Sequence, residues 1–294
     1  MRQRLKDYAD FLKQIRLFFE ERKVLEVSTN YLSDYATTDV YIDSLETTIN
    51  KEINQQKNQY FHTSPEIEMK KLLLQGSGDI YQIAKVFRNN EQGAINNNEF
   101  TMLEWYRLID YQQLINEIEA LVMMLLGIKN IQKISYQEVF KTFAGIDNIH
   151  KKNLNELKYF AKKHKLNDDF DNLEDMQIFL FVHFIQPQLK TIFIYDYPEA
   201  QKALSKVKNG IAQRFELYIE GVEIANGYQE LTNIKEYKSR FLADIARRKE
   251  INKLTPALDT AFLQNINNLP NCSGVALGLD RLFMIKSNKF TLEK

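Results

Sequence analysis

The segment with the richest chemistry begins at Arg88 and continues, after a polar loop over residues 89–98, into the run Glu99–Tyr106. Because side chains alternate between the two faces of a strand, four of them would share one face here: Phe100, Met102, Glu104 and Tyr106. A carboxylate among apolar neighbours is rarely buried without a cationic partner. An aromatic ring, a carboxylate, a phenol and a guanidinium suit a nucleotide base, an amine and a phosphate, so this strand is predicted to line a binding site.

Two further carboxylates lie on a predicted hairpin over residues 215–225 that turns at its Glu-Gly pair. With a two-residue turn, Leu217 would pair with Ile224. Glu216 would then lie diagonal to Glu223 on the same face, about 7–8 Å away. Like charges at this separation are unfavourable without a cation between them, and Mg²⁺ that carries substrate phosphates accepts carboxylate oxygens. Two unrelated glutamates on a solvated face are the alternative interpretation.

Two glycine-containing segments would let the backbone approach a ligand. Asn226-Gly227 is predicted to form a sharp turn that projects Asn226 and Glu230 towards a ligand, although the pattern alone favours a plain turn. Residues 274–281 are predicted to pass from a glycine-bearing strand into a helix. Arg281 would open that helix and could reach a terminal phosphate or stack over a base, with simple packing as the default interpretation.

Helices and strands that could position these groups are indicated along the whole chain. Ser64-Pro65 predicts the start of a helix with Glu66 in its first turn. The other expected elements are helices over 5–22, 114–125 and 233–250, strands over 24–27, 81–88, 99–107 and 191–197, and a mostly helical insertion over 130–210. Irregular alternation and hairpins favour the α+β class, with an antiparallel sheet flanked by helices. No linker or repeat divides the chain, so one domain over residues 1–294 is expected.

The composition argues against several classes of protein. The 39 basic and 39 acidic side chains balance, so there is no global attraction for nucleic acid, and tRNA is not an expected partner. The single Cys272 excludes an internal disulfide and, with only four histidines, argues against a zinc site. Apolar runs are too short to span a membrane, and the N-terminus lacks a signal core, so we expect a cytoplasmic protein with no membrane partner.

Four segments together resemble the signature motifs of the class II aminoacyl-tRNA synthetases, in the lysyl branch: Thr63–Glu66, Glu99–Tyr106, Glu223–Leu231 and Cys272–Leu282. The resemblance extends from about residue 4 to residue 285, and it implies the antiparallel catalytic domain of that family. Two features resemble a truncated paralogue group rather than tRNA-charging members. No anticodon-binding barrel is expected before the first helix, and Ala276 stands where lysyl-tRNA synthetases carry glycine. In the family, the extra methyl group goes with (R)-β-lysine over α-lysine.

The resemblance also implies ATP and Mg²⁺ as cofactors and assigns roles to individual residues. Arg88 and Arg281 would be catalytic, because Arg88 would hold the α-phosphate and the substrate carboxylate while Arg281 lies near the γ-phosphate. Phe100 would stack on adenine, and Glu216 and Glu223 would bind the metal. The remaining residues of the implied ATP site are Asn90 and Glu91. The implied substrate site comprises Ser64, Glu66, Glu104, Tyr106, Asn226, Tyr228, Glu230 and Ala276.

The reaction implied by the resemblance has two steps and needs no covalent enzyme intermediate. Lysine or (R)-β-lysine would be activated as an aminoacyl-adenylate, with release of pyrophosphate. The ε-amino group of a specific lysine on translation elongation factor P would then accept the aminoacyl group. The family also implies a homodimer that associates around residues 10–30.

The loop after Arg88 departs from the pattern of the family. Asn90 stands where a glutamate is usual, with Glu91 one place later, and residues 94–98 replace the usual basic groups. We hypothesise that Glu91 supplies the missing carboxylate through a shifted loop. These departures leave two alternatives: a catalytically weakened lysine- and ATP-binding paralogue with a regulatory role, or a minimal lysyl-tRNA synthetase. The expectation of no anticodon-binding barrel, the neutral charge and Ala276 count against the second alternative.

Overall fold

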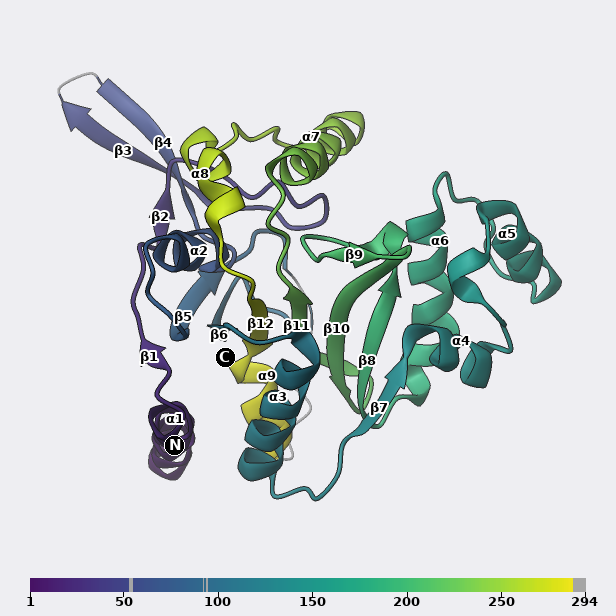
Figure 1. Ribbon diagram of the computed structural model, residues 1–294, viewed down its shortest axis with the longest axis horizontal. Helices are drawn as coiled ribbons and strands as arrows, with labels where there is room; N and C mark the ends of the chain where they lie inside the picture. The colour runs from purple at the N-terminus through teal and green to yellow at the C-terminus, as the bar shows by residue number, and fades with distance from the viewer. Residues whose placement is uncertain (53–54, 92, 94, 288–294) are drawn as a thin grey trace.

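A large mixed sheet forms the centre of the protein (Figure 1). The structure is a computed structural model that describes residues 1–52, 55–91, 93 and 95–287, with only the backbone described for residues 51, 52 and 55. The strand order is β1 (Leu25–Glu26), β5 (Ile80–Phe87), β6 (Glu99–Arg107), β12 (Ser273–Gly278), β11 (Val222–Gln229), β10 (Ile211–Ile219), β8 (Thr191–Pro198) and β7 (Gln132–Ser135), with β9 (Val207–Lys208) beside β10. Pairing is antiparallel except between β1 and β5 and between β7 and β8. The predicted α+β class is confirmed.

Alternation along the central strands separates an apolar face from a polar one. Leu103 and Trp105 of β6 are fully buried in a core that also contains Val275 and Leu277 of β12. Three helices cover this face: α1 (Arg2–Glu21), α3 (Tyr111–Leu126) and α9 (Leu279–Lys286). The intervening side chains, including Glu104, therefore point to the opposite face, as the period of two predicted.

Three other helices gather around the polar face of β6: α2 (Glu66–Leu74), α7 (Ile234–Glu250) and α8 (Thr260–Asn265). They share an apolar cluster with Tyr106 and Ile80. The predicted helix start is confirmed, with Glu66 in the first turn of α2, but Pro65 is the N-cap and not the first helical residue. The Ser64 hydroxyl accepts a hydrogen bond from the backbone amide of Glu66 at 3.0 Å. The expected helices over 5–22, 114–125 and 233–250 correspond to α1, α3 and α7. Across the described residues, no helix combines the length and apolar character that crossing a membrane requires.

The insertion between α3 and β10 forms a separate lobe at the right of Figure 1. It contains α4 (Tyr136–Ala144), α5 (Leu154–Lys163) and α6 (Leu173–Leu180), and these helices share an apolar cluster with β8. Its mostly helical character and its strand near 191–197 were expected, whereas the short strands β7 and β9 were not. A second sheet, β2 (Leu32–Ser33), β4 (Gln55–Phe61) and β3 (Glu46–Glu52), projects from the opposite side.

Candidate active site

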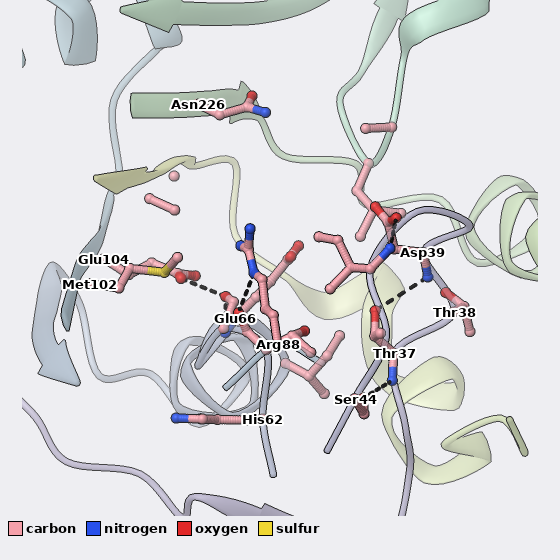
Figure 2. Close-up of a pocket in the computed structure, with 18 of the residues that line it drawn as sticks. Thr37, Thr38, Asp39, Ser44, His62, Glu66, Arg88, Met102, Glu104 and Asn226 are labelled. Carbon is pink, nitrogen blue, oxygen red and sulfur yellow. Dashed lines mark hydrogen bonds between the residues drawn. The ribbon is translucent and has the colours of Figure 1, made fainter. Parts of the chain in front are cut away.

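A cavity of about 630 Å³ lies over the polar face of the central strands. Figure 2 shows Glu66, Arg88 and Glu104 at one side of it, Asn226 above them, and the segment 37–39 across from them. Most of the predicted site residues line this cavity: Ser64, Glu66, Arg88, Glu91, Phe100, Glu104, Tyr106, Glu223, Asn226, Tyr228, Glu230, Ala276 and Arg281. Residues distant in the sequence are therefore brought to one surface.

Strand register places three of these side chains in a row across the sheet. Ala276 of β12 pairs with Glu104 of β6 on one side and with Asn226 of β11 on the other. In the next row, Gly274 lies between Tyr106 and Tyr228. Paired residues of neighbouring strands point to the same face, so the methyl group of Ala276 lies between a carboxylate and an amide.

The hairpin between β10 and β11 turns as predicted, but its register differs from the prediction. Its two-residue turn has positive φ values at Glu220 (48°) and Gly221 (73°), which suits a tight hairpin. Leu217 pairs with Ala225 and not with Ile224, because a β-bulge shifts the register. The extra residue of a bulge changes which side chains share a face.

This bulge brings Glu223 to the same cavity as Asn226, although the two residues are three positions apart along β11. Without it, the period of two would place these two side chains on opposite faces. The bulged Ile224 is almost fully buried in the main apolar core. The register shift is thus the local feature that brings the Glu223 carboxylate to the cavity.

The turn predicted at Asn226-Gly227 is wrong, because both residues continue β11. Gly227 has no positive φ and serves a close approach instead. A Cβ at this position would lie 2.3 Å from the Phe215 ring and 2.7 Å from the carbonyl oxygen of Gly274. The glycine therefore permits tight strand packing. The Oδ1 atom of Asn226 is buried and has no hydrogen-bond partner among the described residues.

Carboxylates dominate one end of the cavity, which we call the amino-acid end and define by Glu66, Glu104 and Glu230. Glu104 accepts hydrogen bonds from the Ser64 hydroxyl at 2.6 Å and from the Tyr106 hydroxyl at 2.7 Å. Burial, with the neighbouring charge of Glu66, raises the pKa of Glu104 to about 8. Burial also raises the pKa of Glu230 to about 7. This end favours cations, because their charge compensates the cost of ionising buried carboxyl groups.

Sequence reasoning did not single out Lys70, which lies behind the amino-acid end. Its ammonium group is fully buried and contacts Glu66 and Glu230, each at 2.5 Å. These carboxylates hold the pKa of Lys70 above its usual value despite desolvation. Its spacing of four residues from Glu66 on α2 is a helical ion-pair signal, but such pairs are common on exposed faces.

Arginines dominate the other end, which we call the nucleotide end and define by Arg88, Phe100 and Arg281. The guanidinium of Arg88 lies 5.2 Å from the centroid of the Phe100 ring, and its Nε donates to the carbonyl of Thr63 at 3.3 Å. Arg281 donates to the carbonyl of Glu223 at 2.9 Å. Two cations and an aromatic face therefore border the same space, an arrangement suited to phosphates and a base.

The loop after Arg88 places its acidic residue differently from the usual family pattern. Asn90 adopts a left-handed conformation with φ of 62°, its amide donates to Asp43 at 3.4 Å, and it does not line the cavity. Glu91 does line the cavity and accepts from Asn96 at 3.0 Å, and Asn96 in turn accepts from Arg281 at 2.8 Å. Ala94, part of the unusual loop, lies outside the described residues.

Glu216 lies behind the cavity wall with its carboxylate already engaged. Its oxygens accept from Arg214 and from the hydroxyls of Tyr197 (2.5 Å) and Tyr218 (2.6 Å). Glu223, by contrast, lines the cavity, and burial beside Glu216 raises its pKa to about 7. No cluster of three or more metal-ligating side chains occurs within the described ranges. Of the predicted pair, Glu223 lines the cavity and Glu216 does not. A single carboxylate from this pair fits an ion that is held mainly by substrate phosphates, as Mg²⁺ commonly is.

Arg248 of α7 fixes the segment that closes the cavity opposite the sheet, and sequence reasoning missed it. It donates to the carbonyls of Asp39 and Ile42 and pairs with the Asp43 carboxylate at 2.9 Å. It is almost fully buried. Asp43 also binds the backbone amide of Asn89 through its carbonyl at 2.7 Å. The cavity wall and the end of strand β5 are thereby joined.

A family model and several named proteins are similar to this chain over nearly its whole length. The family model described as tRNA synthetases class II (D, K and N) matches residues 1–292. A protein of Vibrio cholerae named elongation factor P--(R)-beta-lysine ligase is 39% identical over 99% of this chain and 93% of its own length. Proteins with the same name from Mannheimia succiniciproducens and Buchnera aphidicola are each 38% identical, over 97% of this chain and 91% and 92% of their own lengths.

Proposed function

Because the chain belongs to the class II tRNA synthetase family of the D, K and N type, we propose that it is an ATP-dependent ligase acting on elongation factor P. It activates (R)-β-lysine, or lysine, as an aminoacyl-adenylate and transfers it to the ε-amino group of a specific lysine on that protein. The observation that carries this proposal is one cavity with carboxylates at one end and two arginines at the other. The names of the relatives indicate the acceptor and the amino acid.

The amino-acid end binds the two ammonium groups of the substrate. Glu66 takes the amino group nearer the carboxylate, while Glu104 and Glu230 lie deeper in the same pocket. Further contacts come from Ser64, Tyr106, Asn226, Tyr228 and Ala276. The unpartnered Oδ1 of Asn226 is an acceptor available to such a group. Charge-assisted hydrogen bonds in a partly dry pocket supply affinity and reject substrates without a second amine.

The nucleotide end binds ATP, with the adenine on Phe100 and the phosphates near Arg88 and Arg281. Glu91 takes the role of the family's usual glutamate, since it lines the cavity while Asn90 does not. Glu223, supported by Glu216, would hold Mg²⁺ on the phosphates, and this ion would neutralise phosphate charge. Arg88 compensates the negative charge that develops at the α-phosphate.

The two steps of the reaction need no reactant other than ATP, the amino acid and the acceptor amine. A carboxylate oxygen of the amino acid attacks the α-phosphorus of ATP, the bond to the bridging oxygen of the β-phosphate breaks, and pyrophosphate leaves. The acceptor amine then attacks the carbonyl carbon of the adenylate, the C–O bond to AMP breaks, and the nitrogen loses a proton as the amide forms. Chain residues act by orientation and electrostatics.

The proposal includes a single catalytic domain over residues 1–294, located in the cytoplasm and acting as a homodimer that associates around residues 10–30. In support of one domain, α2, β6, β11 and β12 all contribute to a single cavity. The mass of the purified protein in solution tests the dimer, and a monomeric mass would contradict it. Binding of tRNA is not expected, because the chain carries no net charge.

The two alternatives have less support. A weakened binding paralogue would be favoured if the nucleotide end had lost its arginines, but Arg88 and Arg281 both line the cavity. A minimal lysyl-tRNA synthetase would be favoured by relatives that charge tRNA, but the similar proteins above are named as ligases for elongation factor P.

The test is intact-mass analysis of elongation factor P after incubation with this protein, ATP, Mg²⁺ and either lysine isomer. We expect a gain of one lysyl unit, larger in yield with (R)-β-lysine. The control contains tRNA in place of elongation factor P. Labelled lysine found on tRNA alone would support the synthetase alternative, and the absence of amino-acid-dependent pyrophosphate exchange would support the weakened paralogue.

A further inference from the structure

Lys70 is an internal cation that the implied reaction does not use. Its side chain has no exposed surface, and Nζ lies 2.5 Å from Oε1 of Glu66, 2.5 Å from Oε2 of Glu230 and 3.1 Å from the Tyr237 hydroxyl. The centroids of the Tyr106 and Tyr237 rings lie 5.9 Å and 5.7 Å away. Two carboxylates and two aromatic rings thus surround this ammonium group, and it does not line the cavity.

In each of the two carboxylates, one oxygen contacts Lys70 and the other does not. Lys70 engages Oε1 of Glu66 and Oε2 of Glu230, so the second oxygen of each group is left for the cavity that both residues line. The free Oε1 of Glu230 borders Gly274, where an added Cβ would lie 2.6 Å from it. Gly274 therefore leaves the space that this oxygen occupies, while Lys70 holds the other oxygen of Glu230.

The balance of charges at the amino-acid end also depends on Lys70. The amino-acid end has three carboxyl groups, Glu66, Glu104 and Glu230, and one internal ammonium, Lys70. A diamino acid brings two further ammonium groups, so three acids would meet three cations. Lys70 thereby matches the pocket to a substrate with two amines, since without it one buried carboxylate would lack a cation.

We propose that Lys70 is a positioning residue that fixes Glu66 and Glu230 relative to each other, and so sets the separation of amino groups that the pocket accepts. This inference rests on the proposed function. The amino groups of lysine are on C2 and C6, and those of β-lysine are on C3 and C6, so the isomers differ by one carbon in this separation. A rigid pair of carboxylates distinguishes them, whereas a mobile pair does so less well.

The effect of a substitution at Lys70 on substrate binding should be confined to the amino-acid end. All the hydrogen bonds and ion pairs described for Lys70 are to Glu66, Glu230 and Tyr237. None of these residues belongs to the arginine and aromatic set at the nucleotide end. A change at Lys70 should therefore alter the KM for the amino acid without altering the KM for ATP.

The experiment is amino-acid-dependent pyrophosphate exchange with the full chain and the variants Lys70→Met and Lys70→Arg. For Lys70→Met we expect the KM for the amino acid to rise at least tenfold and the KM for ATP to change less than twofold. The preference between (R)-β-lysine and lysine should shrink at least threefold. Lys70→Arg keeps the charge in a larger group. It should also shrink the preference between the isomers, with a smaller rise in the KM for the amino acid.

The matched control is Lys71→Met, one residue along the same helix. Lys71 also pairs with two carboxylates, Glu68 at 2.6 Å and Asp259 at 2.9 Å, but it is partly exposed. We expect its isomer preference and amino-acid KM to stay within twofold of the original values. If Lys70→Met shows no cooperative thermal transition, Lys70→Arg provides the test, and the shift of its melting temperature by each isomer replaces turnover.

Three results would overturn the inference. These are an unchanged amino-acid KM and isomer preference, equal rises in the KM for ATP and for the amino acid, or a lower amino-acid KM. The last would mean that Lys70 competes with the substrate for the carboxylates. Failure of the proposed function is distinguishable, because the unmodified protein itself would then show no exchange with either isomer.

Discussion

At the amino-acid end of the cavity, Glu104 and Tyr106 project from a paired strand, and Glu104 accepts two hydrogen bonds from neighbouring side chains. At the nucleotide end, Glu91 and Asn96 belong to a loop and reach Arg281 through a chain of hydrogen bonds. Strand residues hold a fixed geometry, while loops adjust more easily. The difference suggests that selectivity for the amino acid is built into the sheet, whereas the ATP contacts are assembled partly from a loop.

The largest expected effect is at the nucleotide end, where Arg88→Ala removes the cation beside Phe100. We expect pyrophosphate exchange to fall by on the order of 10²- to 10³-fold, because a group that stabilises developing charge is lost. The control is Arg247→Ala, which removes a partly exposed arginine paired with Glu250. Exchange reduced equally by both variants would contradict a specific role for Arg88.

Glu104→Gln tests the amino-acid end with almost no change in shape. We expect the KM for the amino acid to rise at least about 30-fold, because a buried charged partner of the substrate is lost. The KM for ATP should stay within about twofold. Steady-state exchange at varied concentrations of each substrate measures both values, and an equal rise in both would remove the distinction between the two ends.

The pH dependence of the KM for the amino acid should also distinguish the two ends of the cavity. The pKa of Glu104 is raised to about 8 in the protein without substrate, so this carboxyl group is mostly protonated at pH 6 and must ionise to bind an ammonium. The KM for the amino acid should therefore fall about tenfold or more between pH 6 and pH 8, while the ε-amino group remains charged.

In Glu104→Gln most of this dependence of the amino-acid KM on pH should disappear. The part below about pH 7 should persist, because Glu230 titrates there. An identical pH profile in the variant and the original protein would show that another group controls binding.

Ala276→Gly examines the one methyl group between Glu104 and Asn226. We expect the preference to move about fivefold towards lysine, the lower end of what one carbon contributes in a pocket. Competition between the isomers for adenylate formation, followed by mass analysis, measures the ratio. A ratio that stays the same would mean that other contacts distinguish the isomers.

The smallest effect is expected from Glu91→Ala, because its contact with Asn96 lies in a partly exposed loop. The KM for ATP should rise about threefold, with no change in the KM for the amino acid. Glu99→Ala is the control, since Glu99 is an exposed partner of Lys85 on the adjoining strand. Unchanged exchange in Glu91→Ala would refute the hypothesis that Glu91 replaces the usual glutamate.

Local patterns and the family motifs in the sequence predicted much of the fold, and most of the site residues that they singled out line the cavity. The period of two along Glu99–Arg107 predicted which side chains would share a face with Glu104, and the turn at Glu220-Gly221 predicted a hairpin. The family motifs predicted which segments would meet. These features depend on neighbours in the chain, so they can be recognised before the fold is known.

Tertiary contacts decided the remaining details. The bulge that turns Glu223 towards the cavity depends on pairing between β10 and β11, and the need for glycine at position 227 comes from the ring of Phe215 on the paired strand. Lysines are mostly exposed, so only the packing of α2 against distant segments could show that Lys70 is buried between Glu66 and Glu230. A bulge depends on how two strands pair, and the burial of a lysine depends on segments far apart in the chain, so the local patterns in the sequence did not show either feature.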